Sequence, residues 1–229
     1  MKLANQTVLV TGAAGNLGPY VISRLLDDGA EVIGTYLSDS DLNTDEYPEA
    51  VTYYQADLTD QVAVESLAET VNADHGGVDH IVGLAGGFSM GGIDDTDAAA
   101  FEAALSRHAT TAFLTVRAFA DQLDDRSGIV LFSSDRAIDA TAGTLAYNVG
   151  KGAVRTLAES LNEELDARVN AVAPFLIDVP GNREAMPDAD FSEWTAAEAV
   201  ADEVLHQLTN EGVAGQTIRM TGGQPEVAT

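Results

Sequence analysis

Two side chains able to carry proton chemistry, Tyr147 and Lys151, stand four residues apart in a segment with helical patterning. Residues at this spacing share one face of a helix. A free tyrosine titrates near pH ~10, and a nearby ammonium group lowers that pKa toward the working range. Ser134 follows a predicted strand, from which its hydroxyl could hydrogen-bond to a substrate carbonyl. The three residues predict an acid–base centre that acts on a carbonyl or hydroxyl group.

An isolated tyrosine and lysine at this spacing are as often a surface helix pair without chemistry. The rest of the chain favours the chemical interpretation, because its only lysines are Lys2 and Lys151, against nine arginines. In a chain with so few lysines, one of the two stands at the spacing from Tyr147 that this chemistry uses. A glycine-rich loop also stands upstream, in the order that a nucleotide-dependent enzyme requires.

The glycine-rich loop, Thr11–Gly18, follows the apolar run Val8–Val10 and leads into a predicted helix. Glycines at such a turn let backbone N–H groups approach a pyrophosphate, and the helix N-terminus adds partial positive charge. The alternative is a tight turn without a ligand. We predict a nucleotide site with contacts from Gly12, Ala14, Gly15, Asn16, Leu17 and Gly18.

The choice between NAD and NADP depends on the end of the second predicted strand, near Tyr36. Enzymes that use NAD often carry an acid there, and those that use NADP carry a cation for the 2′-phosphate. This chain has neither at Thr35–Ser38, while Asp39 and Asp41 would repel a phosphate if they faced it. The pattern favours NAD slightly over NADP.

Short runs rich in valine and isoleucine alternate with longer helical patterns along the chain. The predicted strands are Thr7–Val10, Glu31–Tyr36, Val51–Gln55, Val78–Gly83, Gly128–Ser133, Arg168–Ala173 and Gln216–Met220. The predicted helices are Leu17–Asp28, Gln61–Asn72, Asp97–Leu123, Leu145–Leu165 and Thr195–Leu208.

This alternation predicts a single α/β domain over residues 1–229, a Rossmann fold with a doubly wound parallel sheet of about seven strands and helices on both faces. Ser38–Glu49 is polar, and we expect it to form a surface loop. Phe175–Glu193 is the longest irregular segment and could cover an active site.

The formal net charge is −26, from 37 acidic and 11 basic residues spread along the chain. Such a field repels nucleic acid and anionic membranes, so we expect neither as a partner. Dispersed acid with scarce lysine is typical of proteins from salt-accumulating halophiles, and an acidic mesophilic protein is the alternative. No apolar run reaches the ~20 residues of a membrane span. We expect a cytoplasmic protein.

The chain contains no cysteine. This excludes disulfides, thiolate catalysis and zinc or iron–sulfur sites with cysteine ligands. We expect no metal site.

Together these motifs resemble the short-chain dehydrogenase/reductase family over nearly the whole chain. Gly12, Gly15 and Gly18 are similar to its cofactor loop, with G-x-x-G-x-x-G rather than G-x-x-x-G-x-G spacing. Asp57 matches the acid that usually binds adenine, and Asn170–Pro174 matches the segment near the nicotinamide. Beyond the glycine loop, the resemblance implies cofactor contacts from Tyr36, Asp57, Leu58, Ala85, Gly86, Tyr147, Lys151 and Pro174.

The resemblance implies that Ser134, Tyr147 and Lys151 are catalytic, and that a dimer or tetramer forms through the long helices. Three departures stand out. Gly83–Gly86 replaces the usual Asn-Asn-Ala-Gly, and Phe175 replaces the glycine after the proline. His108 occupies the place of the helix asparagine that normally completes the proton relay. A histidine there could donate, accept or hold a relay water, or it could be packed without chemistry.

Two further segments, Ala85–Gly92 and Asn182–Thr195, are similar to parts of dihydropteridine reductases, which use NADH to reduce quinonoid dihydropterins. Those enzymes lack the serine that Ser134 supplies, and they carry an acid after the second strand. The second likeness could be structural, with Met186 and Phe191 forming a lid. The apolar residues that could line a substrate pocket or belong to the core are Phe88, Met90, Phe175, Met186, Phe191 and Trp194.

The function predicted from these residues is hydride transfer between a nicotinamide and a carbonyl or hydroxyl carbon of a small molecule, with Tyr147 as acid and base. Dihydropterin reduction is one alternative. A nucleotide-sensing protein without catalysis is a second, which His108 and Phe175 allow and the intact Ser134 and Lys151 argue against. A scaffolding subunit is the third, and it would bind no nucleotide.

Overall fold

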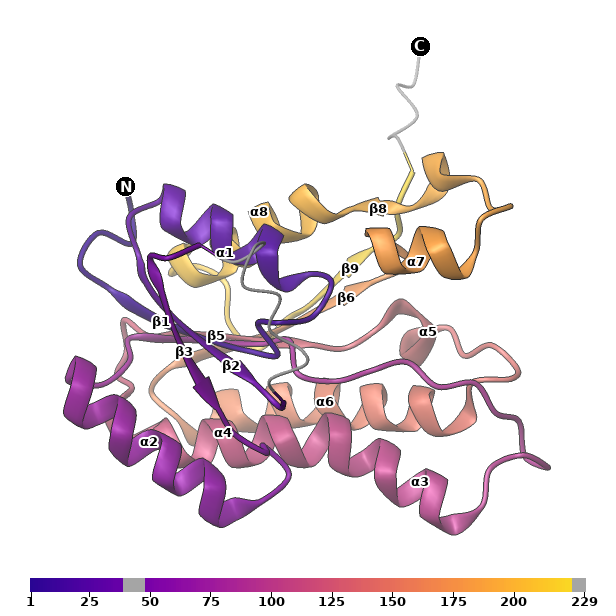
Figure 1. Ribbon diagram of the computed structural model, residues 1–229, viewed down its shortest axis with the longest axis horizontal. Coiled ribbons are helices and arrows are strands. Elements are labelled where there is room, and N and C mark those ends of the chain that lie inside the picture. Colours follow the sequence, from indigo (N-terminus) through magenta and orange to yellow (C-terminus); the bar gives the residue numbers. More distant parts are fainter. Residues whose placement is uncertain (39–47, 224–229) are drawn as a thin grey trace.

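The computed structural model describes residues 1–38 and 48–223, so Asp39, Asp41 and most of the predicted loop Ser38–Glu49 lie outside it. Its main sheet confirms the prediction of about seven parallel strands in a doubly wound fold (Figure 1). The strand order is β3-β2-β1-β4-β5-β6-β9. The bounds are β1 (Thr7–Thr11), β2 (Glu31–Tyr36), β3 (Val51–Gln55), β4 (His80–Gly83), β5 (Gly128–Phe132), β6 (Arg168–Pro174) and β9 (Thr217–Met220).

Helices cover both faces of this sheet (Figure 1). One face carries α1 (Gly18–Asp27) and α8 (Ala197–Thr209). The other carries α2 (Gln61–His75), α3 (Ala98–Leu105), α4 (Thr111–Phe119) and α6 (Leu145–Glu164).

Alternation along the strands divides the buried residues between two cores. In β1, for example, Leu9 packs toward α2, α4 and α6, while Val8 and Val10 pack toward α1 and α8. Because both faces are covered, the strands read in the sequence as nearly continuous apolar runs.

The predicted helix Asp97–Leu123 is interrupted. Its start is as expected, since the Asp97 carboxylate caps α3 by accepting from the Ala100 amide at 2.8 Å. A π-helical turn, Ser106–Thr110, then separates α3 from α4, and a 3-10 turn follows at Ala120–Gln122. The π turn carries His108, and such turns are frequent at functional sites.

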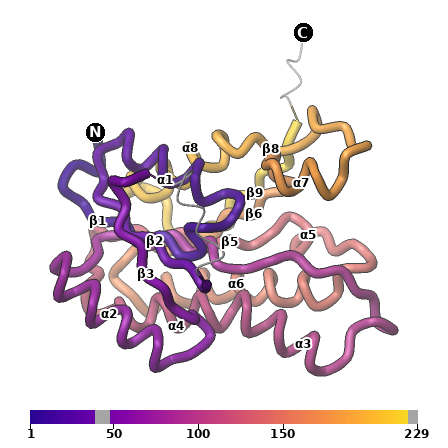
Figure 2. Tube along the Cα trace, viewed as in Figure 1, coloured from indigo at the N-terminus to yellow at the C-terminus, as the bar shows by residue number. Residues whose placement is uncertain are grey.

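The segment predicted as irregular, Phe175–Glu193, contains β7 (Ile177–Asp178), α7 (Pro180–Ala185) and a 3-10 turn, Phe191–Glu193. Figure 2 traces it beside the end of β9. The Phe175 amide donates to the Met220 carbonyl at 2.8 Å. The next helix was predicted to start at Thr195, but β8 (Thr195–Ala196) pairs with β7 first and α8 begins at Ala197.

No helix within the described ranges is long and apolar enough to cross a membrane.

Candidate active site

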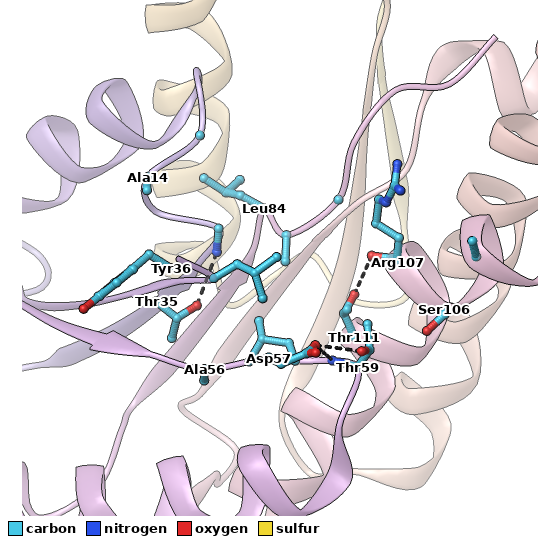
Figure 3. A pocket seen from close by; sticks show the side chains of 17 residues that line it. Ala14, Thr35, Tyr36, Ala56, Asp57, Thr59, Leu84, Ser106, Arg107 and Thr111 are labelled. Carbon is cyan, nitrogen blue, oxygen red and sulfur yellow. Dashed lines mark hydrogen bonds between the residues drawn. The ribbon is translucent and has the colours of Figure 1, made fainter. Parts of the chain in front are cut away.

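A cavity of about 610 Å³ opens at the carboxyl ends of β1 to β4 (Figure 3). The strand order reverses between β1 and β4, which is the point where open α/β sheets bind ligands. Of the predicted cofactor residues, those that line it are Gly12, Ala14, Gly15, Tyr36, Asp57, Leu58, Ala85 and Gly86.

The glycine loop brings backbone close to the cavity. Gly12 has φ +63°, and a Cβ there would lie 2.8 Å from the backbone of Ala85. Only glycine tolerates that conformation and approach without strain. A Cβ on Gly18 would lie 1.9 Å from the Ala13 carbonyl oxygen, so this glycine lets α1 begin against its own loop.

The predicted residues Asn16, Leu17 and Gly18 do not line the cavity. A Cβ on Gly181 in α7 would lie 2.6 Å from the Asn16 side-chain nitrogen, so α7 lies against the glycine loop. The segment expected to cover the active site therefore contacts the predicted pyrophosphate loop.

Asp57 stands at the cavity as a charged acceptor. Its carboxylate accepts from the Thr59 amide at 2.9 Å and the Thr59 hydroxyl at 2.7 Å, and these bonds lower its pKa. The contacts hold the side chain at the wall of the cavity (Figure 3).

The predicted catalytic residues lie where β5 ends against α6. Lys151 is buried, and its ammonium donates to the Phe132 carbonyl oxygen at 2.8 Å. Burial lowers the pKa of Lys151 to about 8. The Ser133 hydroxyl donates to the Lys151 carbonyl at 2.9 Å. Ser134 follows as the cap of the short helix α5 (Asp135–Ile138), which was not predicted.

Tyr147 is half-buried on α6, with its ring 5.0 Å from that of Phe88 and 5.5 Å from that of His108. Burial raises the pKa of its phenol, while a hydrogen bond with Ser134 and the charge of Arg136 lower it. The structure thus brings Ser134 and Tyr147 together, as predicted. The Lys151 ammonium, by contrast, is bonded to the Phe132 carbonyl oxygen.

His108 is buried, and its Nδ1 makes no hydrogen bond with any residue of the described chain. Burial, reinforced by the charges of Lys151 and Arg107, lowers the pKa of His108 to about 3. A Cβ on Gly86 would lie 3.0 Å from His108 Nδ1 and 3.4 Å from Lys151 Nζ. Because Gly86 also lines the cavity, it joins the cavity to the side chains predicted to be catalytic.

Pro174 is buried at the end of β6, one residue beyond the predicted strand, and it does not line the cavity. Of the six candidate pocket residues, Trp194 belongs to the buried interior, while Phe88, Met90 and Phe175 are exposed at 58%, 74% and 36%. Phe88, whose ring lies 5.0 Å from that of Tyr147, thus gives this part of the site an exposed apolar side chain.

Two arginines at the site were not predicted. Arg107 is on the π turn and, among the residues that the structure describes, is the only basic one that lines the cavity. Arg136 lies two residues after Ser134, and its guanidinium sits 5.8 Å over the Phe175 ring. Their positions in the sequence are the one clue to both arginines. Arg107 directly precedes His108, and Arg136 lies two residues after Ser134.

A dinucleotide cavity at the switch point, beside serine, tyrosine and lysine, defines a nicotinamide-dependent oxidoreductase. Residues 6–190 match the family model described as short chain dehydrogenase, and the chain belongs to the short-chain dehydrogenase/reductase family. It is therefore an NAD(P)-dependent oxidoreductase, as predicted.

Individual relatives bear out both the family and the finer resemblance. The chain is 27% identical over 212 residues to a dihydropteridine reductase of Dictyostelium discoideum, covering 90% of this chain and 89% of that protein. It is 31% identical over 230 residues to the 1-deoxy-11-beta-hydroxypentalenate dehydrogenase of Streptomyces avermitilis, covering 92% and 84%.

The solved structures agree on the fold. A blue fluorescent protein from a metagenomic library, in complex with NADPH, superposes with a TM-score of 0.87 at 24% identity, covering 97% of this chain and 99% of that one.

Proposed function

We propose that this protein transfers a hydride between NAD and a carbonyl or hydroxyl carbon of a small molecule, with Tyr147 as the acid and base. The observation that carries the proposal is the position of Gly86, which lines the cofactor cavity and lies against both Lys151 and His108. The cavity thus ends at the residues that would handle the proton.

The residues fit a bound dinucleotide, because Gly12 leaves a backbone cradle that a Cβ would fill. When bound, the nicotinamide supplies or accepts the hydride. Ser134 holds the substrate oxygen through its hydroxyl, and Tyr147 exchanges the proton with that oxygen. Since burial raises the phenol pKa, Tyr147 is protonated at neutral pH and ready to act as the acid in reduction.

Lys151 would hold the nicotinamide ribose and add positive charge near the phenol, once its ammonium turns from Phe132. His108 stays neutral at neutral pH, since its pKa is lowered to about 3. A neutral imidazole with a free Nδ1 can hold a relay water at the place of the family asparagine.

The preference for NAD is supported by charge. Residues 25–106, which supply β2, β3, β4 and most of the cavity lining, contain no lysine or arginine. A 2′-phosphate beside Tyr36 would therefore meet no lysine or arginine from residues 25–106. Arg107 belongs to the opposite wall of the cavity (Figure 3).

The test is a titration of NADH and NADPH, followed by cofactor fluorescence in molar KCl, and then turnover with ketones, 3-oxoacyl thioesters and a quinonoid dihydropterin. We expect tighter NADH binding and turnover of a carbonyl compound. Tight binding without turnover of any probe would favour a sensor, and no binding would favour a scaffold. Tighter binding of NADPH than of NADH would refute the choice of NAD as the cofactor but would leave the proposed hydride transfer standing.

Dihydropterin reduction is the second candidate, because of the likeness to the Dictyostelium enzyme. Ser134 supports ordinary carbonyl chemistry instead, since dihydropteridine reductases lack this serine. If the quinonoid dihydropterin is reduced faster than every carbonyl probe, dihydropterin reduction becomes the first candidate and carbonyl chemistry the second.

We also propose a homodimer or homotetramer joined through α4 and α6. A shallow hollow of about 530 Å³ lies between them, with Phe113 exposed at 41%. Its lining residues are small or apolar: Ala109, Thr110, Phe113, Ala153, Thr156, Leu157 and Ser160. Light scattering in molar KCl should show that the wild type is an oligomer and that Phe113→Glu is dissociated. A monomeric wild type would refute the proposed oligomer.

A further inference from the structure

Arg136 places a cation beside the proposed catalytic residues. Its backbone N–H donates to the Ser134 hydroxyl at 3.3 Å, and its guanidinium sits 5.8 Å over the Phe175 ring. Phe175 directly follows the segment Asn170–Pro174, which the family resemblance places near the nicotinamide. Arg136 thus contacts both Ser134, after the end of β5, and Phe175, after the end of β6.

The acidic residues nearest to Arg136 are paired elsewhere. Asp135 and Asp139 flank it along the chain, and both form ion pairs with Arg219 of β9. Asp139 is three residues beyond Arg136, a spacing at which the two would otherwise pair on a helix. Among the described residues, none of the ion pairs within 4.0 Å includes Arg136.

The guanidinium also keeps most of its hydrogen-bonding capacity. An arginine carries five N–H donors, and the bond that Arg136 makes through them within the described chain goes to the Thr141 hydroxyl at 2.9 Å. Thr141 and Phe175 hold the half-buried side chain in place. The remaining donors are available to a molecule bound at Tyr147.

A chain of charge −26 repels anions overall. Within the described part of the chain, the half-buried Arg136 has no carboxylate partner, so its guanidinium is available to bind an anionic ligand at the proposed catalytic centre. A planar guanidinium matches the two oxygens of a carboxylate or phosphate. We propose that the substrate carries such an oxyanion and that Arg136 binds it beside Ser134 and Tyr147. This inference rests on the proposed hydride transfer and adds the class of substrate.

The test compares probes with and without an anionic group. Acetoacetate is paired with its methyl ester, and dihydroxyacetone phosphate with dihydroxyacetone, each with saturating NADH in molar KCl. In wild type, kcat/KM should favour the anion of at least one pair. Arg136→Gln should reduce that preference about tenfold to a hundredfold, the range expected for a charge-assisted hydrogen bond. The pair that responds identifies carboxylate or phosphate.

Arg24→Gln is the matched control. It removes the same charge from the chain at an exposed pair with Asp202, far along α1 from the site. The control should keep the wild-type preference, and Arg136→Lys should keep part of it. An unchanged preference in Arg136→Gln, or an equal loss in Arg24→Gln, would overturn the inference.

Binding without turnover separates this inference from the proposed function. Calorimetry on the NADH-loaded Tyr147→Phe variant measures anion binding whether or not hydride transfer occurs. Binding that Arg136→Gln abolishes supports the anion site even if every probe fails to react, in which case only the proposed reaction is lost. If none of the anions binds, or if binding survives Arg136→Gln, the anion site is wrong.

Discussion

The ammonium of Lys151 donates to the carbonyl oxygen of Phe132, the last residue of β5, at 2.8 Å. The Ser133 hydroxyl completes the connection by donating to the Lys151 carbonyl at 2.9 Å. Helix α6 is therefore bonded to the strand end through both the side chain and the backbone of one residue. The Lys151 ammonium also lies near the cavity, since a Cβ on the lining residue Gly86 would be 3.4 Å from Lys151 Nζ.

Replacing Lys151 with methionine removes a buried charge but keeps the volume. Because burial of an ammonium is costly, we expect the free energy of unfolding to stay within about 1 kcal/mol of wild type. Turnover should fall at least ~100-fold, as expected for the loss of proton-transfer assistance. Denaturant unfolding and steady-state kinetics measure the two effects. Lys2→Met, at the other lysine, should change neither, and a Lys151→Met enzyme that keeps full turnover contradicts the role.

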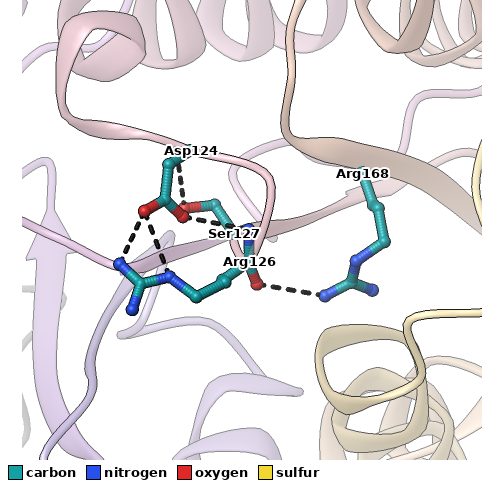
Figure 4. Close-up of polar contacts among 4 residues, drawn as sticks. All are labelled: Asp124, Arg126, Ser127 and Arg168. Atoms are coloured by element: carbon teal, nitrogen blue, oxygen red, sulfur yellow. Dashed lines mark hydrogen bonds and ion pairs between the residues drawn. The ribbon is translucent and has the colours of Figure 1, made fainter.

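Arg168 stabilises the end of α8. Its buried guanidinium donates to four carbonyl oxygens, one of them that of Arg126 (Figure 4). The others belong to Gln207, Leu208 and Asn210.

Arg168→Met leaves these carbonyl groups without a donor, and we expect it to cost about 3 kcal/mol or more. NADH affinity of the folded fraction should not change. Urea unfolding measures the cost, with Arg24→Met as the control, since an exposed pair contributes at most ~1 kcal/mol. Equal effects of the two variants would contradict the account.

His80 makes stability depend on pH. Its Nδ1 accepts from the Gly128 amide at 2.8 Å, and burial lowers its pKa to about 4. In the unfolded chain the pKa is near ~6.5, so between these values the unfolded state binds more protons and stability falls as pH falls. The loss should approach about 3 kcal/mol at pH ~4.

His80→Gln keeps an acceptor for Gly128 but does not titrate, so part of this pH dependence should disappear. Urea unfolding of both proteins across this pH range measures the difference. Parallel pH curves for wild type and variant would show that His80 is not the group responsible.

The charge of −26 predicts that salt stabilises the fold. At molar salt the Debye length falls to ~3 Å, and repulsion between surface carboxylates is screened. We expect the melting temperature to rise steadily with KCl into the molar range, and much less with sucrose at the same osmolality. A melting temperature that does not respond to KCl would contradict a halophilic adaptation.

The strands and the glycine loop could be predicted because their causes are local. Buried parallel strands read as runs of valine and isoleucine, and the spacing of Gly12, Gly15 and Gly18 reflects backbone approach. Tyr147 was assigned from spacing and from the scarcity of lysine, and the structure places it beside Ser134.

Features that depend on distant partners could not be predicted. The π turn at Ser106–Thr110 lies inside an uninterrupted helical pattern. Arg136 has no carboxylate partner among the described residues because Arg219, which lies far along the chain, forms ion pairs with both Asp135 and Asp139. The same holds for Lys151, whose bond to Phe132 is not encoded by the spacing to Tyr147.

The central claim is that the Tyr147 phenol exchanges the proton. Tyr147→Phe removes the hydroxyl and keeps the ring that packs on Phe88 and His108. With whichever substrate the wild type turns over, the variant should bind NADH with wild-type affinity, while kcat falls at least ~100-fold. Full turnover by the Tyr147→Phe enzyme would contradict the assignment.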